Sequence, residues 1–191
     1  MLENLHLILA SGSPRRKALI ESLGVPFSVV SQAVDESYPP DLLVSDVAAY
    51  LAEKKAKPFL SSLKENEVLI TSDTVVVFEN EILGKPENLS EAKTIIQKLS
   101  GNIHKVITGV ALHSLKHKVV FSEETQVKFK VLREKDIHYY VETFKPLDKA
   151  GAYGIQEWIG KIGVEKIEGC YYNVMGLPIS RIWSELQINT L

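Results

Sequence analysis

Apolar and polar positions along this chain follow two periods, which predict a series of strands and helices. Short apolar or β-branched runs bounded by turn residues predict strands, and apolar residues spaced three and four apart predict helices. The predicted strands span residues 5–10, 27–31, 68–78, 104–115, 118–132 and 164–167, and the predicted helices span residues 14–23, 45–57, 90–100, 135–143 and 178 onward. Ser13, Ser45 and Ser90 are expected to cap the first three helices, because a serine hydroxyl accepts a hydrogen bond from a free backbone N–H.

The run 118–132 shows the clearest alternation. Val127, Phe129 and Val131 alternate with two lysines, Lys128 and Lys130. A period of two with one apolar side is typical of a strand whose sheet buries one face and exposes the other. We therefore expect the three apolar side chains to point inward.

Asp73 lies in the middle of the predicted strand 68–78. Apolar runs on both sides of it indicate a central strand that is covered on both faces. An unpaired carboxylate there would be costly, so Asp73 needs a metal, a cation or several donors nearby. We favour a functional role, and a structural hydrogen-bonding role is the alternative.

The segment 9–16 predicts a strand, a tight turn and a helix start in close succession. Arg15 and Arg16 fall in the first helical turn, where the helix dipole is positive and basic side chains are unfavourable. A helix N-terminus presents free N–H groups to an anion, and arginine pairs bidentately with phosphate. The two arginines therefore indicate a phosphate site, with two solvated surface arginines as the alternative.

Other charged positions could serve a phosphate or a metal. Asp35 and Glu36 are adjacent in a predicted loop, where they either bind a hard cation or are solvated. Lys55 falls within the apolar stripe of its helix, so its ammonium either extends to solvent or enters an internal cleft. Lys85 lies between a glycine and a proline that restrict the backbone and would aim its side chain, with an ordinary loop lysine as the alternative.

Composition limits the classes of protein. The 191 residues suffice for one large domain or two small lobes, and 45% hydrophobic with 24% charged residues is ordinary for a soluble globular protein. A net charge of −2 argues against a general nucleic-acid or membrane-surface binder. One cysteine, Cys170, fits a reducing compartment. The start, residues 1–4, has no basic n-region and no apolar run reaches the length of a membrane span, so we expect a cytoplasmic protein.

Several common catalytic motifs do not occur. The chain has no G-x-x-x-x-G-K-[ST] loop, no G-x-G-x-x-G and no G-x-S-x-G. The histidines lack zinc-binding spacing, and we expect them to be solvated. They are His6, His104, His113, His117 and His138.

The candidate residues together suit the hydrolysis of a phosphoanhydride. Cations offset the charge that would repel a nucleophile, a divalent metal polarises a phosphoryl oxygen, and a carboxylate orients or deprotonates water. Gln156, in a polar loop, could recognise a base edge, because an amide both donates and accepts hydrogen bonds. The candidate cations are Arg15, Arg16, Lys55 and Lys85, and the candidate metal ligands are Glu36 and Asp73.

In sequence order, these motifs resemble those of the Maf family, from about residue 7 to residue 187. The matching blocks are residues 10–16 (ASGSPRR), 35–37 (DES), 55–56 (KA), 72–76 (SDTVV), 82–86 (ILGKP), 99–101 with His104, 108–110 (TGV), 148–156 (DKAGAYGIQ) and 169–178. The order and number of the blocks make the resemblance far more specific than any one block.

The resemblance implies a nucleoside triphosphate pyrophosphatase, which cleaves between the α- and β-phosphates with a divalent cation, Mg²⁺ or Mn²⁺. It implies an elongated α/β fold with a mixed sheet and two lobes around a central cleft, similar to inosine triphosphatase, with residues 1–191 as a single domain. Asp73 matches the proton acceptor or metal-linked catalytic carboxylate, and Glu36 matches a residue that assists the metal. The positions that match substrate-binding residues are Ser11, Arg15, Arg16, Lys55, Thr74, Lys85 and Gln156.

The resemblance also bears on the base. Arg15, Thr74 and Gln156 match the specificity positions of the branch that prefers dTTP and UTP, and the GAYGIQ motif differs from the 7-methyl-GTP branch. Modified pyrimidine nucleotides are further expected substrates. One residue departs from the family, which commonly has glycine after this glutamine, where this chain has Glu157. A bulky acidic residue there could reshape the base pocket.

A rival interpretation is a non-catalytic nucleotide-binding regulator, for instance of cell division, which the family's septum-formation name suggests. The presence of both Asp73 and Glu36 favours an enzyme, because binding alone needs cations and no general base. Single-stranded nucleic-acid binding is a weaker alternative. From the family we also expect a homodimer and a house-cleaning role in nucleotide metabolism.

Overall fold

The computed structural model describes residues 5–189, and the expectation drawn from residues 1–4 lies outside them. The strands are β1 (His6–Ala10), β2 (Phe27–Val30), β3 (Glu67–Phe78), β4 (Glu81–Leu83), β5 (Ile103–His113), β6 (Lys118–Phe129) and β7 (Val164–Glu168). The helices are α1 (Pro14–Glu21), α2 (Val44–Ala56), α3 (Leu89–Leu99), α4 (Glu134–Phe144), α5 (Trp158–Gly163), α6 (Tyr171–Val174) and α7 (Ile179–Asn189), with 3₁₀ turns η1 (Lys57–Ser62) and η2 (Ala150–Ala152).

The strands form a mixed sheet in the order β2-β1-β3-β5-β6-β7, and β4 pairs with β3. Strand β1 runs parallel to β2 and to β3, whereas β3–β4 and β6–β7 are antiparallel pairs. The predicted mixed α/β class is therefore confirmed. No helix among residues 5–189 is long and apolar enough to cross a membrane.

The chain divides into two compact units. The first comprises the residues up to Asp73, Thr108–Glu123 and the residues from Gly176 onward, and the second comprises Thr74–Ile107 and Glu124–Met175. Strands β3, β5 and β6 contribute residues to both units. That residues 1–191 act as a single domain stays a prediction.

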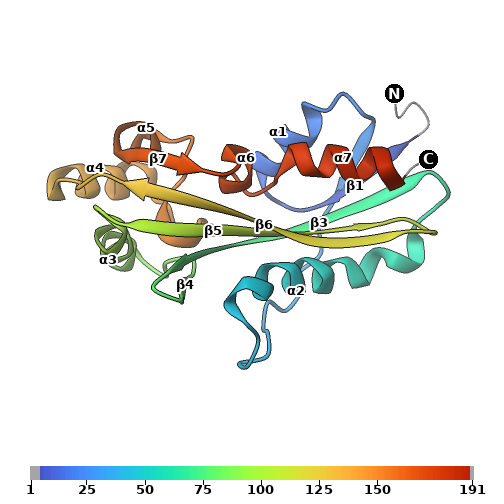
Figure 1. The fold of residues 1–191 in the computed structure, drawn as a ribbon, viewed down its shortest axis with the longest axis horizontal. Helices are drawn as coiled ribbons and strands as arrows, with labels where there is room; N and C mark the ends of the chain where they lie inside the picture. The colour runs from blue at the N-terminus through green and yellow to red at the C-terminus, as the bar shows by residue number, and fades with distance from the viewer. Residues whose placement is uncertain (1–4, 190–191) are drawn as a thin grey trace. The chain divides into compact units, whose positions relative to one another are not determined.

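In the first unit, α2 covers one face of the strands and α7 the other, below and above them in Figure 1. Helix α2 approaches β5 very closely at Gly109, where an added Cβ would lie 2.1 Å from the carbonyl carbon of Ala48. The buried Thr71 hydroxyl donates a hydrogen bond to the carbonyl oxygen of Ala52 at 2.7 Å. Both contacts fix α2 on the sheet, and α2 carries Lys55.

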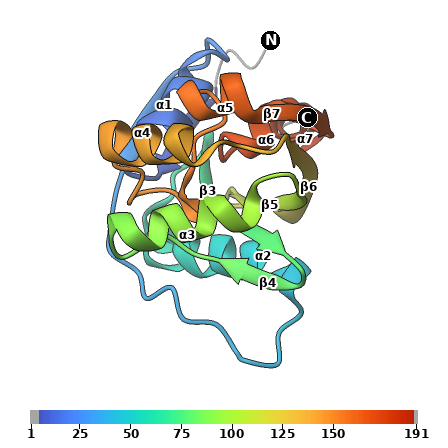
Figure 2. The ribbon, with the colours of Figure 1, turned by 90° about the vertical axis from the view of Figure 1, so that its left-hand side faces the viewer.

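The second unit has its own apolar core beneath α3 and α4, which contact each other directly (Figure 2). The rings of His104, Phe129 and Tyr153 meet there edge to face, with centroids 5.0 to 5.3 Å apart. Ring pairs at such distances contribute specific packing beyond the burial of their area. This core anchors Tyr153, which belongs to the segment leading to Gln156.

Two of the three predicted helix caps are wrong. Ser13 caps α1 as predicted, because its Oγ accepts from the N–H of the third helical residue at 3.4 Å. Helix α2 begins at Val44 after Leu43, so Ser45 lies inside its first turn. Helix α3 is capped by Asn88 and not by Ser90. Asparagine caps as well as serine does, so composition alone does not decide between neighbouring capping residues.

The predicted inward position of Val131 is also wrong. Val127 and Phe129 are fully buried, but Val131 is 81% exposed. Strand β6 ends at Phe129, and the next N–H, that of Lys130, donates to the carbonyl of Gly163. Once the strand has ended, the period of two no longer decides which face a side chain takes.

Candidate functional site

Three charged side chains of the first unit meet at the last turn of α2. The Lys55 ammonium donates to Asp73 Oδ1 at 2.5 Å and contacts Glu36 Oε1 at 2.7 Å. The side chains of Asp73 and Lys55 are only 13% and 19% exposed, whereas Glu36 is 51% exposed. Lys55 therefore holds its ammonium among carboxylates and does not extend to solvent.

Local sequence explains how this cluster forms. Lys55 falls on the inward side of α2, because Leu51 and Ala52, four and three residues earlier, are buried. Asp73 lies in β3 directly after the buried Thr71 and Ser72. A half-buried carboxylate at such a place needs a cationic partner, and Lys55 supplies one.

The loop that carries Glu36 is held against α2 by a second lysine. Lys54 donates to Asp35 Oδ2 at 3.0 Å and to the carbonyl of Ser37 at 2.8 Å. Hydrogen bonds from Ser37 and then from Lys54 lower the pKa of Asp35 to about 2. Asp35 is thus a loop-fixing residue beside Glu36. The Asp-x-Ser spacing, which is typical of an Asx turn, is the sequence signal that could have revealed this role.

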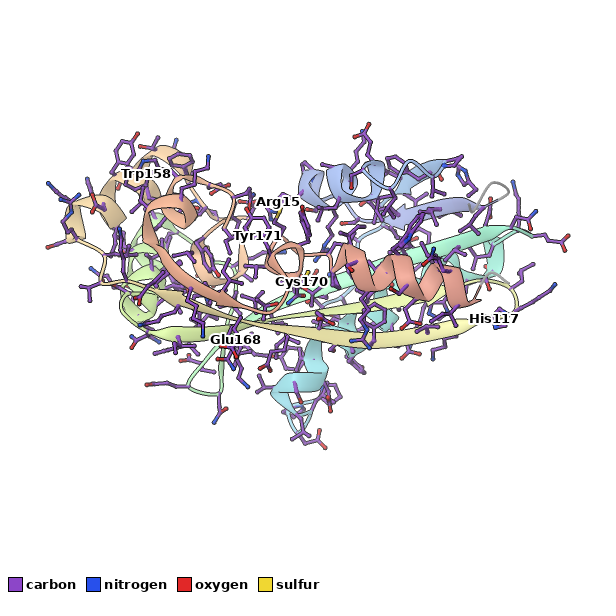
Figure 3. All side chains as sticks on the ribbon, turned by 45° about the horizontal axis from the view of Figure 1, so that its top comes forward. Arg15, His117, Trp158, Glu168, Cys170 and Tyr171 are labelled. Carbon is purple, nitrogen blue, oxygen red and sulfur yellow. The ribbon has the colours of Figure 1, made fainter. Side chains whose placement is uncertain are left out.

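Strand β1, the turn after it and the start of α1 lie in the order that the sequence predicts. Ser11 Oγ accepts a hydrogen bond from the N–H of Ser13 at 3.2 Å, so the turn closes on itself. Arg15 lies half-buried at the beginning of the helix, where Figure 3 labels it. This end of the helix presents positive charge and backbone N–H groups together, as an anion site requires.

Arg16 ties three segments of the first unit together. Its Nε donates to the carbonyl of Gly176 at 2.8 Å, and its Nη1 donates to the carbonyl of Ser72 at 2.9 Å. Burial lowers the pKa of Arg16 below its usual range, and the nearby Asp73 carboxylate opposes that change. One of these donors holds the backbone next to Asp73 and the other holds Gly176, a structural role that the sequence interpretation of Arg16 as a phosphate ligand did not include.

The second unit contains the other sequence-predicted residues. Thr74 is half-buried in β3, and Lys85 is exposed after Gly84, whose carbonyl accepts from the N–H of Gly151 at 3.1 Å. Gln156 is half-buried, and within residues 5–189 no donor reaches its buried Oε1. A buried acceptor without a donor is costly, so this atom favours a ligand that donates a hydrogen bond.

The expectation that all five histidines are solvated is wrong for His104 and His113. They are 1% and 7% exposed, and both lie in β5. Burial lowers the pKa of His104 to about 4, and its Nε2 is 2.7 Å from the hydroxyl of Tyr153. Burial likewise lowers the pKa of His113. Both are neutral core residues at neutral pH.

A divalent metal fits the donors of this cluster. In the part of the chain that the structure describes, no three His, Cys, Asp or Glu side chains converge as a metal-binding group. Asp73 Oδ1 and Glu36 Oε1 nevertheless both contact the Lys55 ammonium, so one oxygen of each carboxylate lies beside the same cation. Mg²⁺ is commonly held by one or two carboxylates, with water and substrate phosphates completing its coordination. A pair of carboxylates is thus a sufficient protein contribution.

Comparison with known proteins agrees with these motifs. The family model described as Maf-like protein matches residues 6–188. A dTTP/UTP pyrophosphatase from Bacteroides thetaiotaomicron is 46% identical over 187 residues, which covers 97% of each chain. Proteins of the same name from Phocaeicola vulgatus and Christiangramia forsetii are 45% and 46% identical, covering 98% of this chain and 99% and 95% of theirs.

Among solved structures, the nucleoside-triphosphatase / dITP/XTP pyrophosphatase of Mycobacterium abscessus aligns with a TM-score of 0.44 and 14% identity, over 65% of this chain and 74% of that one. A likeness at this level carries no conclusion, and the relation to the inosine triphosphatase fold stays a prediction. The family match, by contrast, spans nearly the whole sequence and includes the Lys55 and Asp73 motifs. The chain belongs to the Maf family.

Proposed function

We propose that this protein is a nucleoside triphosphate pyrophosphatase that converts dTTP and UTP to the monophosphate and pyrophosphate. The observation that carries the proposal is the cluster of Lys55, Asp73 and Glu36, in which a half-buried carboxylate is held beside a cation. The names and near-complete coverage of relatives at about 46% identity support the choice of reaction and substrate.

In this proposal, Asp73 is the proton acceptor. A water oxygen forms a bond to the α-phosphorus, the bond from that phosphorus to the bridging oxygen breaks, and pyrophosphate leaves. The water proton passes to the Asp73 carboxylate, which Lys55 holds in place through Oδ1. A positioned carboxylate base typically contributes about 10²- to 10⁴-fold to such a reaction.

The positive side chains hold the phosphates. Arg15 and Ser11 lie at the start of α1, where backbone N–H groups add to the positive potential. Lys55 and Arg16 are positioned by their contacts with Asp73 and with the backbone beside it. Lys85, which is exposed, is proposed as a further phosphate ligand on the strength of its motif.

A divalent cation, Mg²⁺ or Mn²⁺, would be held by Asp73 and Glu36. When bound, it would neutralise phosphate charge and polarise a phosphoryl oxygen. The two carboxylates already gather around the Lys55 ammonium, so the same oxygens attract a hard cation. The loop-fixing pair of Lys54 and Asp35 keeps Glu36 at this position.

Gln156 is the proposed recognition residue for the base. The N3–H of uracil or thymine would donate to its Oε1, which lacks a donor among residues 5–189. Cytosine has an acceptor at N3, so it could not make this bond. Arg15 and Thr74 are the other proposed specificity residues. Modified pyrimidine nucleotides that keep the N3–H would also be accepted.

The proposal also includes a cytoplasmic location, a homodimer, no binding of nucleic acid and a house-cleaning role in the nucleotide pool. Each has its own measurement, namely fractionation, sedimentation, a gel shift and the nucleotide content of a deletion strain. None of them affects the proposed chemistry.

A panel of nucleotides tests the reaction. Purified protein is incubated with UTP, dTTP, CTP, ATP, GTP and 7-methyl-GTP, each with Mg²⁺ or with Mn²⁺, and released pyrophosphate is measured. We expect turnover of UTP and dTTP at least about tenfold faster than of the others, because cytosine and adenine present an acceptor where uracil has N3–H, and the purines are larger than a pyrimidine. Tight binding of these nucleotides without turnover would favour the regulator, and preferred turnover of 7-methyl-GTP would reassign the substrate.

A further inference from the structure

The segment between α4 and α5 is buried in its middle although it contains little regular structure. Residues 151–155 are all buried, and only the short η2 lies within the segment. Gly151 and Ala152 both have positive φ angles, of 67° and 57°. An alanine in the left-handed region costs about 1–2 kcal/mol, so the surroundings must hold this backbone in place.

Glu157 helps to fix the backbone of this segment through an ion pair that joins its two ends. Its Oε1 lies 3.1 Å from the ammonium of Lys149, and the two side chains are 20% and 9% exposed. The pair joins the residue just before η2 to the residue just before α5, so it closes the segment into a loop. We define residues 149–157 as the glutamine loop, because it carries Gln156.

The other oxygen of the same carboxylate joins the glutamine loop to α4. Tyr140, which is fully buried, donates its hydroxyl proton to Glu157 Oε2. The same hydroxyl oxygen accepts a hydrogen bond from the N–H of Gly154 at 3.2 Å. Burial and the Glu157 carboxylate raise the pKa of Tyr140, so its hydroxyl remains a donor.

Gly154 leaves the space that the carboxylate occupies. A Cβ at this position would lie 2.7 Å from Glu157 Cδ. The Glu157 side chain therefore folds back under its own loop. The carboxylate contacts Lys149 at the start of the glutamine loop directly and Gly154 in its middle through Tyr140, and the N–H of Glu157 itself donates to the carbonyl of Gly154 at 3.0 Å.

Gln156 precedes this anchored residue, and Trp158, labelled in Figure 3, begins α5 directly after it. The contacts of Glu157 with Lys149, Tyr140 and Gly154 restrain the backbone on the C-terminal side of Gln156. On the N-terminal side of Gln156, the hydroxyl of Tyr153 is hydrogen-bonded to His104 Nε2 at 2.7 Å. The side chain with the unpartnered Oε1 is thus carried between two fixed points.

We infer that Glu157 is a positioning residue for base recognition, which fixes the glutamine loop so that the Gln156 amide meets the N3–H of a uracil or thymine base. This inference rests on the proposed function. Glu157, which stands where the family commonly has glycine, sharpens the discrimination between bases without contacting the base.

Two variants and one control test it. Glu157→Ala removes both contacts, whereas Glu157→Gln keeps the size and an acceptor for Tyr140 but loses the charge opposite Lys149. Glu165→Gln is the matched control, because Glu165 is a glutamate of the same unit that is 49% exposed and pairs with Lys128 in β6. Each protein is assayed for kcat and KM with UTP and with CTP, and for inhibition by inorganic tripolyphosphate, which has no base.

In Glu157→Ala we expect the ratio of kcat/KM for UTP over CTP to fall about tenfold, mainly through a higher KM for UTP, because one positioned hydrogen bond is lost. The inhibition constant of tripolyphosphate should stay within about twofold of wild type, and Glu157→Gln should lie between wild type and Glu157→Ala. Glu165→Gln should match wild type. If Glu157→Ala does not fold, the ratio measured with Glu157→Gln decides.

An unchanged UTP/CTP ratio in whichever Glu157 variants fold would overturn the inference while leaving the proposed function standing. Equal losses for both nucleotides, with weaker inhibition by tripolyphosphate, would likewise overturn it, because they indicate a general structural role. A wild-type protein that turns over neither UTP nor dTTP, or that does not prefer UTP to CTP, would refute the proposed substrate, and this inference with it.

Discussion

Acidification should destabilise this protein through His104, well above the pH at which carboxylates protonate. His104 is 1% exposed and its Nδ1 has no hydrogen-bond partner among residues 5–189. Its charged form is therefore strongly disfavoured in the folded protein. The perturbation is a fall in pH from 7 to 5, compared between wild type and His104→Gln, whose amide can still reach Tyr153.

The magnitude follows from the change in pKa on folding. Burial lowers the pKa of His104 from 6.5 to about 4, so between these values the unfolded chain binds a proton that the folded chain does not. Stability is then fully present above pH 6.5 and is lost as the pH falls toward 4. The linkage relation gives a loss in the free energy of unfolding of about 2 kcal/mol at pH 5 and about 3 kcal/mol at pH 4.

The assay is urea unfolding at several pH values, followed by circular dichroism. His113 and several carboxylates also have lowered pKa values and lose stability in acid, so only the difference between wild type and His104→Gln isolates His104. That difference should change by about 2 kcal/mol between pH 7 and pH 5. A change below about 0.5 kcal/mol would refute the reasoning, because His104 would then titrate alike in both states.

Three further substitutions have defined outcomes. Lys55→Met should lower kcat for UTP by at least about 100-fold, since it removes the cation that orients Asp73, and kcat above a tenth of wild type would contradict this. Gly109→Ala should lower the free energy of unfolding by at least about 3 kcal/mol, because its Cβ would collide with the backbone of Ala48, and near wild-type thermal stability would argue against that close approach. Arg16→Lys should lower the free energy of unfolding by about 1.5–3 kcal/mol, because one ammonium cannot reproduce two guanidinium hydrogen bonds. An unchanged midpoint of urea unfolding would contradict this expectation.

Hydrophobic periodicity was sufficient to predict most of the strands and helices. The buried strand around Asp73 and the stripe containing Lys55 are local patterns, and each showed that a charged group enters an apolar environment. An internal charge requires a partner, so the two residues could be recognised as candidates separately. Their contact across 18 residues of sequence could not be derived from the pattern.

What could not be predicted depends on contacts between distant elements. His104 lies in a polar–apolar alternation that allows either face, and only the packing of Phe129 and Tyr153 decides that it is buried. From sequence, Glu157 is similarly expected to reshape the base pocket, because nothing nearby in sequence indicates that its carboxylate accepts a hydrogen bond from Tyr140 of α4. The short helices α5 and α6 have four to six residues, too few for a period to be recognised.

The most direct test of the proposed chemistry is to identify the products formed from UTP by ³¹P NMR, with wild type and Asp73→Asn compared at equal concentration. We predict that wild type forms UMP and pyrophosphate in equal amounts, and that Asp73→Asn still binds UTP but forms them at least about 100-fold more slowly. Release of UDP and inorganic phosphate by wild type, or undiminished turnover by Asp73→Asn, would contradict the assignment of Asp73 as the base for cleavage between the α- and β-phosphates.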